Sequence, residues 1–303
     1  MSSGTDDEVA TARADEARRL DAALPLIDWS AHPPGTERDR VDAPSGQLAR
    51  ISLGPVDGER VVLIPGVTGS KEDFILMMPL FAAAGFRVES YDLAGQYESA
   101  AAGPEQLDPP GDHYTLELFV DDLRAVLDTG DQPAHVLGYS FAGTVAGVLA
   151  AAEPERFRSL TFLSAPPVAG QSLREFKVVG RLSDLWSGRS FGRPFIAALR
   201  YNVNRAPADR ALFVKARLEL TRPSSVGDVL ELMKHTPDFA EALRASGSPM
   251  LVTAGTGDVW PASTHRAFAE RLGARALILP PRHSPRQTAP HQLTEAMLRL
   301  MRP

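Results

Sequence analysis

A serine lies between two segments of different character in the stretch "HVLGYSFAGTVAGVLAAA", which runs from His135 to Ala152. The residues before Ser140 form an apolar run typical of a buried strand, and the residues after it are typical of a helix. Gly138 and Ala142 lie two positions before and after the serine, and a sharp strand-to-helix turn requires such small residues there. A serine exposed on this turn can act as a nucleophile in acyl transfer. A turn with a purely structural role gives the same pattern.

A serine nucleophile needs a general base, and the base needs an acid that orients it. Two strands are predicted near the C-terminus, "PMLVTAG" and "RALILP"; Asp258 follows the first and His283 follows the second. Because the carboxyl ends of parallel strands meet at one edge of a sheet, we expect the three side chains to converge there. The alternative for Asp258 is an exposed loop residue without a catalytic role.

The other histidines fit the role of the base less well. His135 opens the same strand as Ser140, which places it about 16 Å away at the opposite end. His265 and His291 lie within or beside predicted helices, where we expect a solvated or capping role. The remaining histidines follow no strand: His32, His113 and His235. The sequence therefore favours His283.

Two backbone N–H groups are predicted to stabilise the oxyanion of an acyl-transfer intermediate. One belongs to Phe141, which follows the serine and begins a helix whose dipole favours negative charge at this end. The other belongs to Val67, which follows Gly66 at the end of the apolar run "RVVLIPG". A plain Pro-Gly turn is the alternative for this second loop.

Strands and helices alternate along most of the chain, and this order favours an α/β fold with a largely parallel sheet covered on both faces. The predicted strands are 47–54, 60–66, 87–93, 134–139, 159–166, 249–255 and 275–280. The predicted helices between and after them are 71–86, 114–128, 141–152, 263–273 and 289–301. The first strand should pair as a hairpin with the residues around Val41.

The alternation stops in the middle of the chain, where helical and loop patterns take over. We interpret residues 167–240 as a helical cap or lid, and residues 38–166 together with 241–303 as the core. Residues 1–37 form an N-terminal extension that is partly helical or flexible, because Pro and Gly cluster near its end.

Composition narrows the class of protein. The chain has 303 residues, a net charge of −6 and no cysteine, so disulfides and thiolate chemistry are excluded and nothing points to nucleic acid. The acidic N-terminus lacks the basic and apolar regions of a secretory signal. The most apolar stretch, "FILMMPLFAAAGF", is too short to span a membrane and contains Pro79. We expect a soluble, cytoplasmic protein.

Five motifs resemble the α/β-hydrolase superfamily, in its capped, esterase-like branch: "PGVTGS", "YDLAGQYES", "GYSFAG", "GTGDVWP" and "RHSPRQTAPHQL". The resemblance runs from about residue 41 to the C-terminus and includes the chain order Ser, Asp, His. It implies a mostly parallel eight-stranded sheet with helices on both faces and a helical cap insertion. Pro65, Tyr97 and Arg282 stand where relatives usually have His, Gly and Gly, which suggests an unusual rim of the site.

The resemblance and the predicted triad together indicate a serine hydrolase that cleaves a carboxylic ester through an acyl-enzyme, with no metal or organic cofactor. Related dehalogenases and epoxide hydrolases use aspartate at the position of Ser140, whereas serine implies acyl chemistry. A thioesterase, a lactonase or a carbon–carbon bond hydrolase with the same triad is the alternative. A non-catalytic ligand-binding protein on this fold is an alternative of another class.

Substrate contacts are expected from Tyr139, Trp186, Trp260 and Arg282, with a small-molecule acyl substrate as the partner. Residues 166–240 carry nine arginines and three lysines against seven acidic residues, and a basic cap can attract an anionic substrate. Alternatively, the cap arginines pair with the body, the cap aromatic residues pack the cap and Trp260 packs its own loop. Both a monomer and a homodimer are compatible with the sequence.

Overall fold

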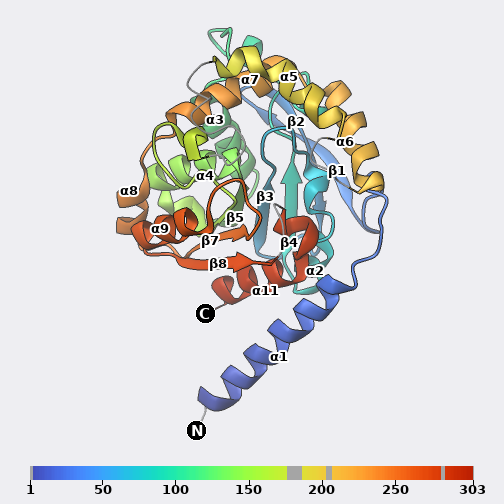
Figure 1. Ribbon diagram of the computed structural model, residues 1–303, viewed down its shortest axis with the longest axis vertical. Coiled ribbons are helices and arrows are strands. Elements are labelled where there is room, and N and C mark those ends of the chain that lie inside the picture. The colour runs from blue at the N-terminus through green and yellow to red at the C-terminus, as the bar shows by residue number, and fades with distance from the viewer. Residues whose placement is uncertain (1–2, 176–185, 203–206, 281–283, 303) are drawn as a thin grey trace.

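The computed structural model describes residues 3–175, 186–202, 207–280 and 284–302, and an eight-stranded sheet forms its centre (Figure 1). The strands are β1 (Glu37–Ala43), β2 (Gly46–Leu53), β3 (Arg60–Ile64), β4 (Arg87–Tyr91), β5 (Ala134–Tyr139), β6 (Phe157–Leu163), β7 (Met250–Gly255) and β8 (Arg275–Leu279). Their spatial order is β1-β2-β4-β3-β5-β6-β7-β8. The strands from β3 to β8 run parallel, and β1 and β2 form the predicted antiparallel hairpin, with Val41 opposite Leu48.

Helices cover both faces of the sheet, as predicted. They are α2 (Met78–Ala83), α3 (Leu116–Leu127), α4 (Phe141–Ala152), α8 (Ala240–Ser246), α9 (Ala262–Leu272), α10 (Pro285–Thr288) and α11 (Pro290–Met301). A further helix, α1 (Ser3–Ala22), lies outside these layers. The side chains of β3 alternate between the two faces. Val62 and Ile64 pack in the cluster that holds α3, α4 and α9, whereas Val61 and Leu63 pack in the cluster that holds α2 and α11.

A helical insertion separates β6 from β7, as the sequence predicts. It contains α5 (Gly188–Arg200), α6 (Ala208–Leu220) and α7 (Pro223–Leu232), which lie together along one side of the molecule (Figure 1). Helices α5 and α7 approach closely at Gly192. A Cβ atom at this position would lie only 2.5 Å from the carbonyl oxygen of Pro223, so a larger residue would push the helices apart. The division of the chain at residues 166 and 241 into core and cap stays a prediction.

The predicted helix over residues 71–86 is wrong in its extent. A short 3₁₀ segment, η1 (Lys71–Phe74), comes first, and regular helix is confined to α2. Pro79 lies in the first turn of α2, where its missing N–H is tolerated, but it could not continue a helix that began at Lys71. Lys71 and Asp73 instead direct their charged groups to ionic partners elsewhere in the chain.

The N-terminal helix α1 projects from the body, with the N-terminus at its far end (Figure 1). Its last turn is attached to α11, because the Asp21 carboxylate accepts a hydrogen bond from the backbone N–H of His291 (2.9 Å). This contact lies on the face of the sheet away from α3 and α4.

In the part of the chain that the structure describes, every helix is too short or too polar to span a lipid bilayer.

A buried carboxylate connects the β1–β2 hairpin to α3. Asp122 of α3 accepts hydrogen bonds from the N–H (3.2 Å) and the hydroxyl (2.7 Å) of Ser45 in the hairpin turn. Burial raises the pKa of Asp122 to about 7, although these hydrogen bonds act in the opposite direction. The folded protein therefore keeps a proton on Asp122 that the unfolded chain releases at a lower pH.

Asp122→Asn should remove a pH-dependent loss of stability. The unfolded chain releases the Asp122 proton near pH 4, whereas the folded protein releases it at about pH 7. The protonated carboxyl therefore stabilises the fold fully below about pH 4, and this contribution is lost as the pH rises to about 7.

Urea unfolding from pH 4 to pH 8 measures this effect. The free energy of unfolding of the wild type should fall relative to that of the variant by on the order of 3 kcal/mol over this range. A difference between the two proteins that stays constant with pH would contradict the assignment.

Candidate active site

Ser140 occupies a strained turn between β5 and α4. Its backbone has φ 53° and ψ −127°, in a region that residues other than glycine rarely adopt. The N–H of Ser140 donates to the carbonyl of Leu163 in β6 (2.9 Å), and the carbonyl of Ser140 accepts from the N–H of Gly143 (2.9 Å). Strand pairing before the serine and helix formation after it thus hold this conformation in place.

Small neighbours are required at this turn for steric reasons. A Cβ atom on Gly138 would lie 2.5 Å from the carbonyl oxygen of Ala142, and one on Gly143 would lie 2.4 Å from the Cβ of Ala165. Both distances are shorter than van der Waals contact allows. The spacing of small residues around Ser140 therefore follows from the close approach of β5, α4 and the segment after β6.

The loop after β3 lies directly against the serine. A Cβ atom on Gly66 would come within 2.9 Å of the Cβ of Ser140 and 2.8 Å of the Tyr139 ring, so only glycine fits without displacement. Two residues later, Thr68 has φ 61°, a second strained position, and its N–H donates to the side-chain oxygen of Gln96 (2.7 Å). This hydrogen bond fixes the loop beside Ser140.

The motif "YDLAGQYES", which begins at the end of β4, also holds the loop after β3 in place. The Asp92 carboxylate accepts from the backbone N–H of Lys71 (2.7 Å) and from its ammonium group (3.0 Å), and both residues are buried. Asp92 and Gln96 were not among the residues predicted for the site. Their position immediately after β4, next to β3 in the sheet, is the signal that places them beside the loop after β3.

Asp258 follows β7 and is fully buried, so it is not an exposed loop residue. One carboxylate oxygen accepts from the N–H of Trp260 (3.0 Å) and lies 3.4 Å from Nε2 of His265. Burial by itself raises the pKa of Asp258. Contacts with the side chains of His265 and Ser164 and with the N–H of Trp260 outweigh burial, so the pKa lies below its usual value. The group is therefore a carboxylate at neutral pH.

His265 differs from the expectation of a solvated or capping histidine. It is fully buried, beside Asp258 and edge-on to the Trp260 ring at 6.2 Å. The signal was present in the sequence: His265, Phe268, Ala269 and Leu272 are spaced as the buried face of a helix, and all four are buried in α9. His283 and Arg282 lie outside the described residues, so their positions relative to Ser140 stay predictions.

A cavity of about 350 Å³ opens beside Ser140. Tyr139, Ser140 and Val67 line it from the body, and Trp186 lines it from the insertion. Trp260 is not among its lining residues and packs in the interior, where its indole N–H donates to the carbonyl of Ser172 (2.9 Å). Three of the sequence-predicted residues with described positions therefore share the cavity with Ser140.

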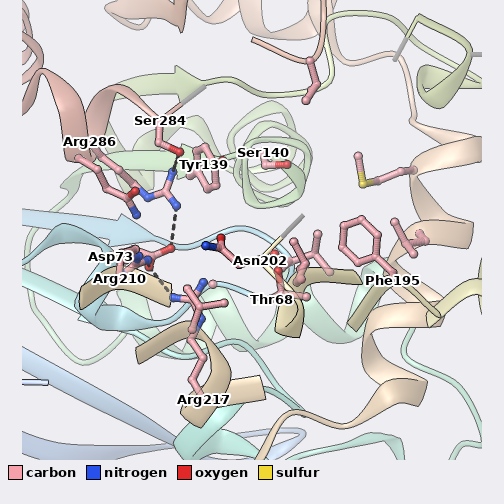
Figure 2. Close-up of a pocket in the computed structure, with 18 of the residues that line it drawn as sticks. Thr68, Asp73, Tyr139, Ser140, Phe195, Asn202, Arg210, Arg217, Ser284 and Arg286 are labelled. Atoms are coloured by element: carbon pink, nitrogen blue, oxygen red, sulfur yellow. Dashed lines mark hydrogen bonds and ion pairs between the residues drawn. The ribbon is translucent and has the colours of Figure 1, made fainter. Parts of the chain in front are cut away.

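The cavity has an apolar side and a charged side, with Ser140 between them (Figure 2). The apolar side consists of cavity-lining residues of the insertion that pack in one hydrophobic cluster: Phe191, Phe195, Leu199, Val214 and Leu230. Figure 2 shows Phe195 on this side and Arg286, Asp73 and Arg210 gathered on the other.

Asp73 is the centre of the charged side. Its carboxylate pairs with Arg210 of α6, with Nη1 of Arg217 of α6 (2.6 Å) and with Nη2 of Arg286 of α10 (2.9 Å). We call these four buried residues the Asp73 cluster. The guanidinium group of Arg286 also stacks over the Tyr139 ring at 3.7 Å.

Charge and burial oppose each other in the Asp73 cluster. Burial would raise the pKa of Asp73, but the three guanidinium groups hold it well below its usual range. Burial lowers the pKa of Arg210 to about 10, because Asp73 offsets only part of the effect of burial and of the two other guanidinium groups. Asp73, Arg210 and Arg286 are therefore ionised at neutral pH.

Five arginines in the described part of the insertion form ion pairs, and three of these pair with the body, as one of the two sequence-based alternatives expected. Arg210 and Arg217 reach Asp73 of the body, and Arg222 reaches Glu105. Arg189 and Arg200 pair within the insertion itself. Pairing alone does not exclude an anionic substrate, because Asp73 is shared among three cations.

Comparison with known proteins gives matches along most of the chain. The protein of Mycobacterium tuberculosis named "Probable oxidoreductase EphD" is 27% identical over 248 residues, which cover 78% of this chain and 38% of EphD. The pimeloyl-[acyl-carrier protein] methyl ester esterase of Neisseria meningitidis is 28% identical over 222 residues, covering 73% of this chain and 70% of the esterase. The chain thus spans well under half of the length of EphD.

Solved structures share the fold. A thermophilic esterase from Thermogutta terrifontis superposes with a TM-score of 0.68 at 19% identity, covering 88% of this chain and 98% of the esterase. Residues 59–267 match the family described as alpha/beta hydrolase fold, and these residues are more than half of the sequence. The eight-stranded sheet, the strained serine after β5 and this match agree, and the chain belongs to the α/β-hydrolase family.

Proposed function

We propose that the protein is a serine hydrolase that cleaves a carboxylic ester through an acyl-enzyme formed on Ser140. The observation that carries the proposal is the strained backbone of Ser140, held at the edge of a cavity with the Gly66 loop against it. Strain of this kind persists only where the surrounding structure imposes it, and it clusters at active sites. The esterases among the similar proteins support the ester substrate.

In this mechanism His283 takes the proton of the Ser140 hydroxyl while the oxygen attacks the ester carbonyl. Asp258 orients the imidazole and stabilises its charged form. The tetrahedral intermediate expels the alcohol, which receives the proton from His283. Water, activated by the same imidazole, then hydrolyses the acyl-enzyme. The buried carboxylate of Asp258, ionised at neutral pH, is suited to this role.

The N–H groups of Val67 and Phe141 would stabilise the negative oxygen of the intermediate. Val67 lines the cavity, and Phe141 begins α4 immediately after Ser140. The ring of Phe141 is buried against Phe119, with centroids 5.2 Å apart, which fixes the start of the helix. A preorganised pair of donors of this kind contributes a large share of catalysis in acyl transfer.

Ser140→Ala should abolish both ester hydrolysis and covalent labelling. With p-nitrophenyl acetate as substrate, we expect kcat to fall at least about a thousandfold, because the nucleophile is lost. A fluorophosphonate probe should label the wild type and leave the variant unlabelled. Ser190→Ala, at an exposed serine of α5, is the matched control and should behave as the wild type. A wild type that neither labels nor turns over any ester would favour the non-catalytic ligand-binding protein.

The choice between the two histidines near the candidate acid can be tested directly. His283→Ala should reduce kcat/KM for p-nitrophenyl acetate by about a thousandfold or more, as expected for loss of the base. His265→Phe should reduce it about tenfold or less, because His265 is buried and does not line the cavity. Phenylalanine keeps the packing against Trp260. The reverse pattern, with the activity surviving only in His283→Ala, would make His265 the functional partner of Asp258.

Gly66→Ala should impair catalysis more than folding. The added methyl group would meet the Tyr139 ring and the Cβ of Ser140, so the Gly66 loop must move away from the serine. We expect the rate of fluorophosphonate labelling to fall at least about tenfold, with a loss of about 1–3 kcal/mol in unfolding free energy.

The matched control for this experiment is Gly111→Ala, where the nearest atom to an added Cβ lies at an ordinary 3.5 Å. This variant should label at the wild-type rate. A Gly66→Ala protein that labels as fast as the control would show that the loop has no part in stabilising the intermediate.

A further inference from the structure

We infer that the charged side of the cavity binds a carboxylate carried by the substrate, so that the enzyme acts on small esters that bear an acidic group. This inference rests on the proposed hydrolysis at Ser140 and deepens it. Arg210, Arg217 and Arg286 supply the cations. Among the described residues that line the cavity, Asp73 is the only carboxylate.

The first argument is the imbalance of charge. Three guanidinium groups that are each only 4–5% exposed share the single carboxylate of Asp73. Buried cations that exceed the available anions cost free energy until an anion compensates them. The adjacent Asp209 lies outside the cavity lining, and among the described residues no ion pair joins it to these three arginines; its Oδ2 accepts from the indole N–H of Trp29 (3.1 Å).

The second argument is the excess of donors. Nη1 of Arg210, Nε of Arg217 and Nε of Arg286 are buried and have no acceptor within the described ranges. Neutral groups satisfy other donors of these arginines: the side-chain oxygen of Gln287, in the amide orientation that suits its surroundings, accepts from Nε (3.2 Å) and Nη2 (2.9 Å) of Arg210. The hydroxyls of Ser70 and Ser284 lie 3.4 Å from guanidinium nitrogens of Arg217 and Arg286. None of these groups supplies the negative charge that the cations lack. A carboxylate offers two oxygens and forms paired, charge-assisted hydrogen bonds with guanidinium groups.

A purely structural role explains this arrangement less well. One aspartate and one arginine suffice to attach α6 to the body. Stacking of Arg210 on Trp29 (4.3 Å) and of Arg286 on Tyr139 (3.7 Å) offsets only part of the cost of burying the further cations. Lys234, the other cation among the described lining residues, shows the contrast, because it lies 3.7 Å from Glu231 and donates to the carbonyl of Trp186 (2.7 Å). The Asp73 cluster is the part of the described lining where cations outnumber their partners.

The position of the cluster relates the carboxylate to the reacting bond. Arg286 stacks on Tyr139, the residue that precedes Ser140, while Phe195 lies on the opposite side of the serine (Figure 2). A substrate with its ester carbonyl at Ser140 therefore extends an acidic end toward the Asp73 cluster and a hydrocarbon end toward the apolar side. The volume of about 350 Å³ restricts this substrate to a small molecule.

Matched pairs of esters test the inference on the wild-type protein. The first series consists of monomethyl esters of dicarboxylic acids from succinic to suberic acid, each compared with its neutral dimethyl ester. The second series consists of ω-acetoxycarboxylates and their methyl esters, which carry the acid in the alcohol part. At the best chain length of one series, kcat/KM for the anion should exceed that for the neutral ester about 10- to 100-fold. Anions that are turned over no faster than neutral esters in both series would overturn the inference.

Variants of α6 identify the groups responsible. Arg210→Gln should reduce the preference for the anion at least about tenfold, and Arg210→Lys should retain part of it. Lys215→Gln removes the same charge from an exposed position of the same helix, outside the cavity lining, and should keep the full preference. An equal loss in Lys215→Gln would attribute the preference to the overall charge and contradict the site.

Competition keeps the inference testable if Arg210→Gln fails to fold. Adipate should inhibit the wild-type hydrolysis of p-nitrophenyl acetate competitively, and hexanoic acid methyl ester should inhibit it at least about tenfold more weakly. Inhibition by inorganic phosphate without inhibition by adipate would contradict a carboxylate site.

Calorimetric binding to the Ser140→Ala protein separates this inference from the proposed function. Monomethyl adipate should bind at least about tenfold more tightly than dimethyl adipate. If the wild type turns over no ester but this preference is present, the proposed hydrolysis fails and the carboxylate site stands. If the wild type hydrolyses neutral esters and the preference is absent, the proposed hydrolysis stands and the carboxylate site fails.

Discussion

The backbone strain at Ser140 is the constraint on which the rest of the site depends. A serine with φ 53° costs on the order of 1–3 kcal/mol relative to a relaxed backbone, so the fold must supply that free energy around it. Strand β5 is buried along its whole length, and α4 is buried at most of its positions. Gly138 and Gly143 allow these two elements to approach, and the hydrogen bond from Ser140 to Leu163 anchors the turn to β6. Core packing thus fixes the position of Ser140, which we propose as the nucleophile.

The Asp73 cluster determines how the insertion meets the body. Asp73 belongs to η1, two of its partners belong to α6 and the third belongs to α10, so one carboxylate connects segments far apart in the sequence. Removing one member of such a buried group leaves an uncompensated charge and typically costs about 3–5 kcal/mol. On the apolar side, α5 is held to α7 by the ion pair of Arg189 with Asp228 (2.6 Å) and by the hydrogen bond from the N–H of Gly188 to Glu231 (2.6 Å). The Asp73 cluster attaches α6 to the body, whereas these contacts hold the helices of the insertion to one another.

Hydrophobic patterns predicted the strands, the antiparallel hairpin and the bounds of α4, because these features depend on local periodicity and on turn residues. The helix expected over 71–86 failed because Lys71 and Asp73 are held by partners that no local pattern reveals. The spacing of His265 with Phe268 and Leu272 indicates the buried face of α9, and this spacing outweighs the usual preference of histidine for a solvated or capping position. The Asp73 cluster could not be predicted from the sequence, because its arginines are separated along the chain and each one alone is typical of a solvated surface.

Tyr139 joins the charged side of the cavity to the strained turn. Its ring supports the guanidinium group of Arg286 at 3.7 Å, and the same ring limits position 66 to glycine, with only 2.8 Å left for a Cβ atom. Its backbone is the last residue of β5 and leads directly into Ser140. A displacement of Arg286 would leave a gap beside this ring or move it, and Gly66 lies against the same ring. Tyr139 is thus the side chain that lies between the proposed anion site and the turn that carries Ser140.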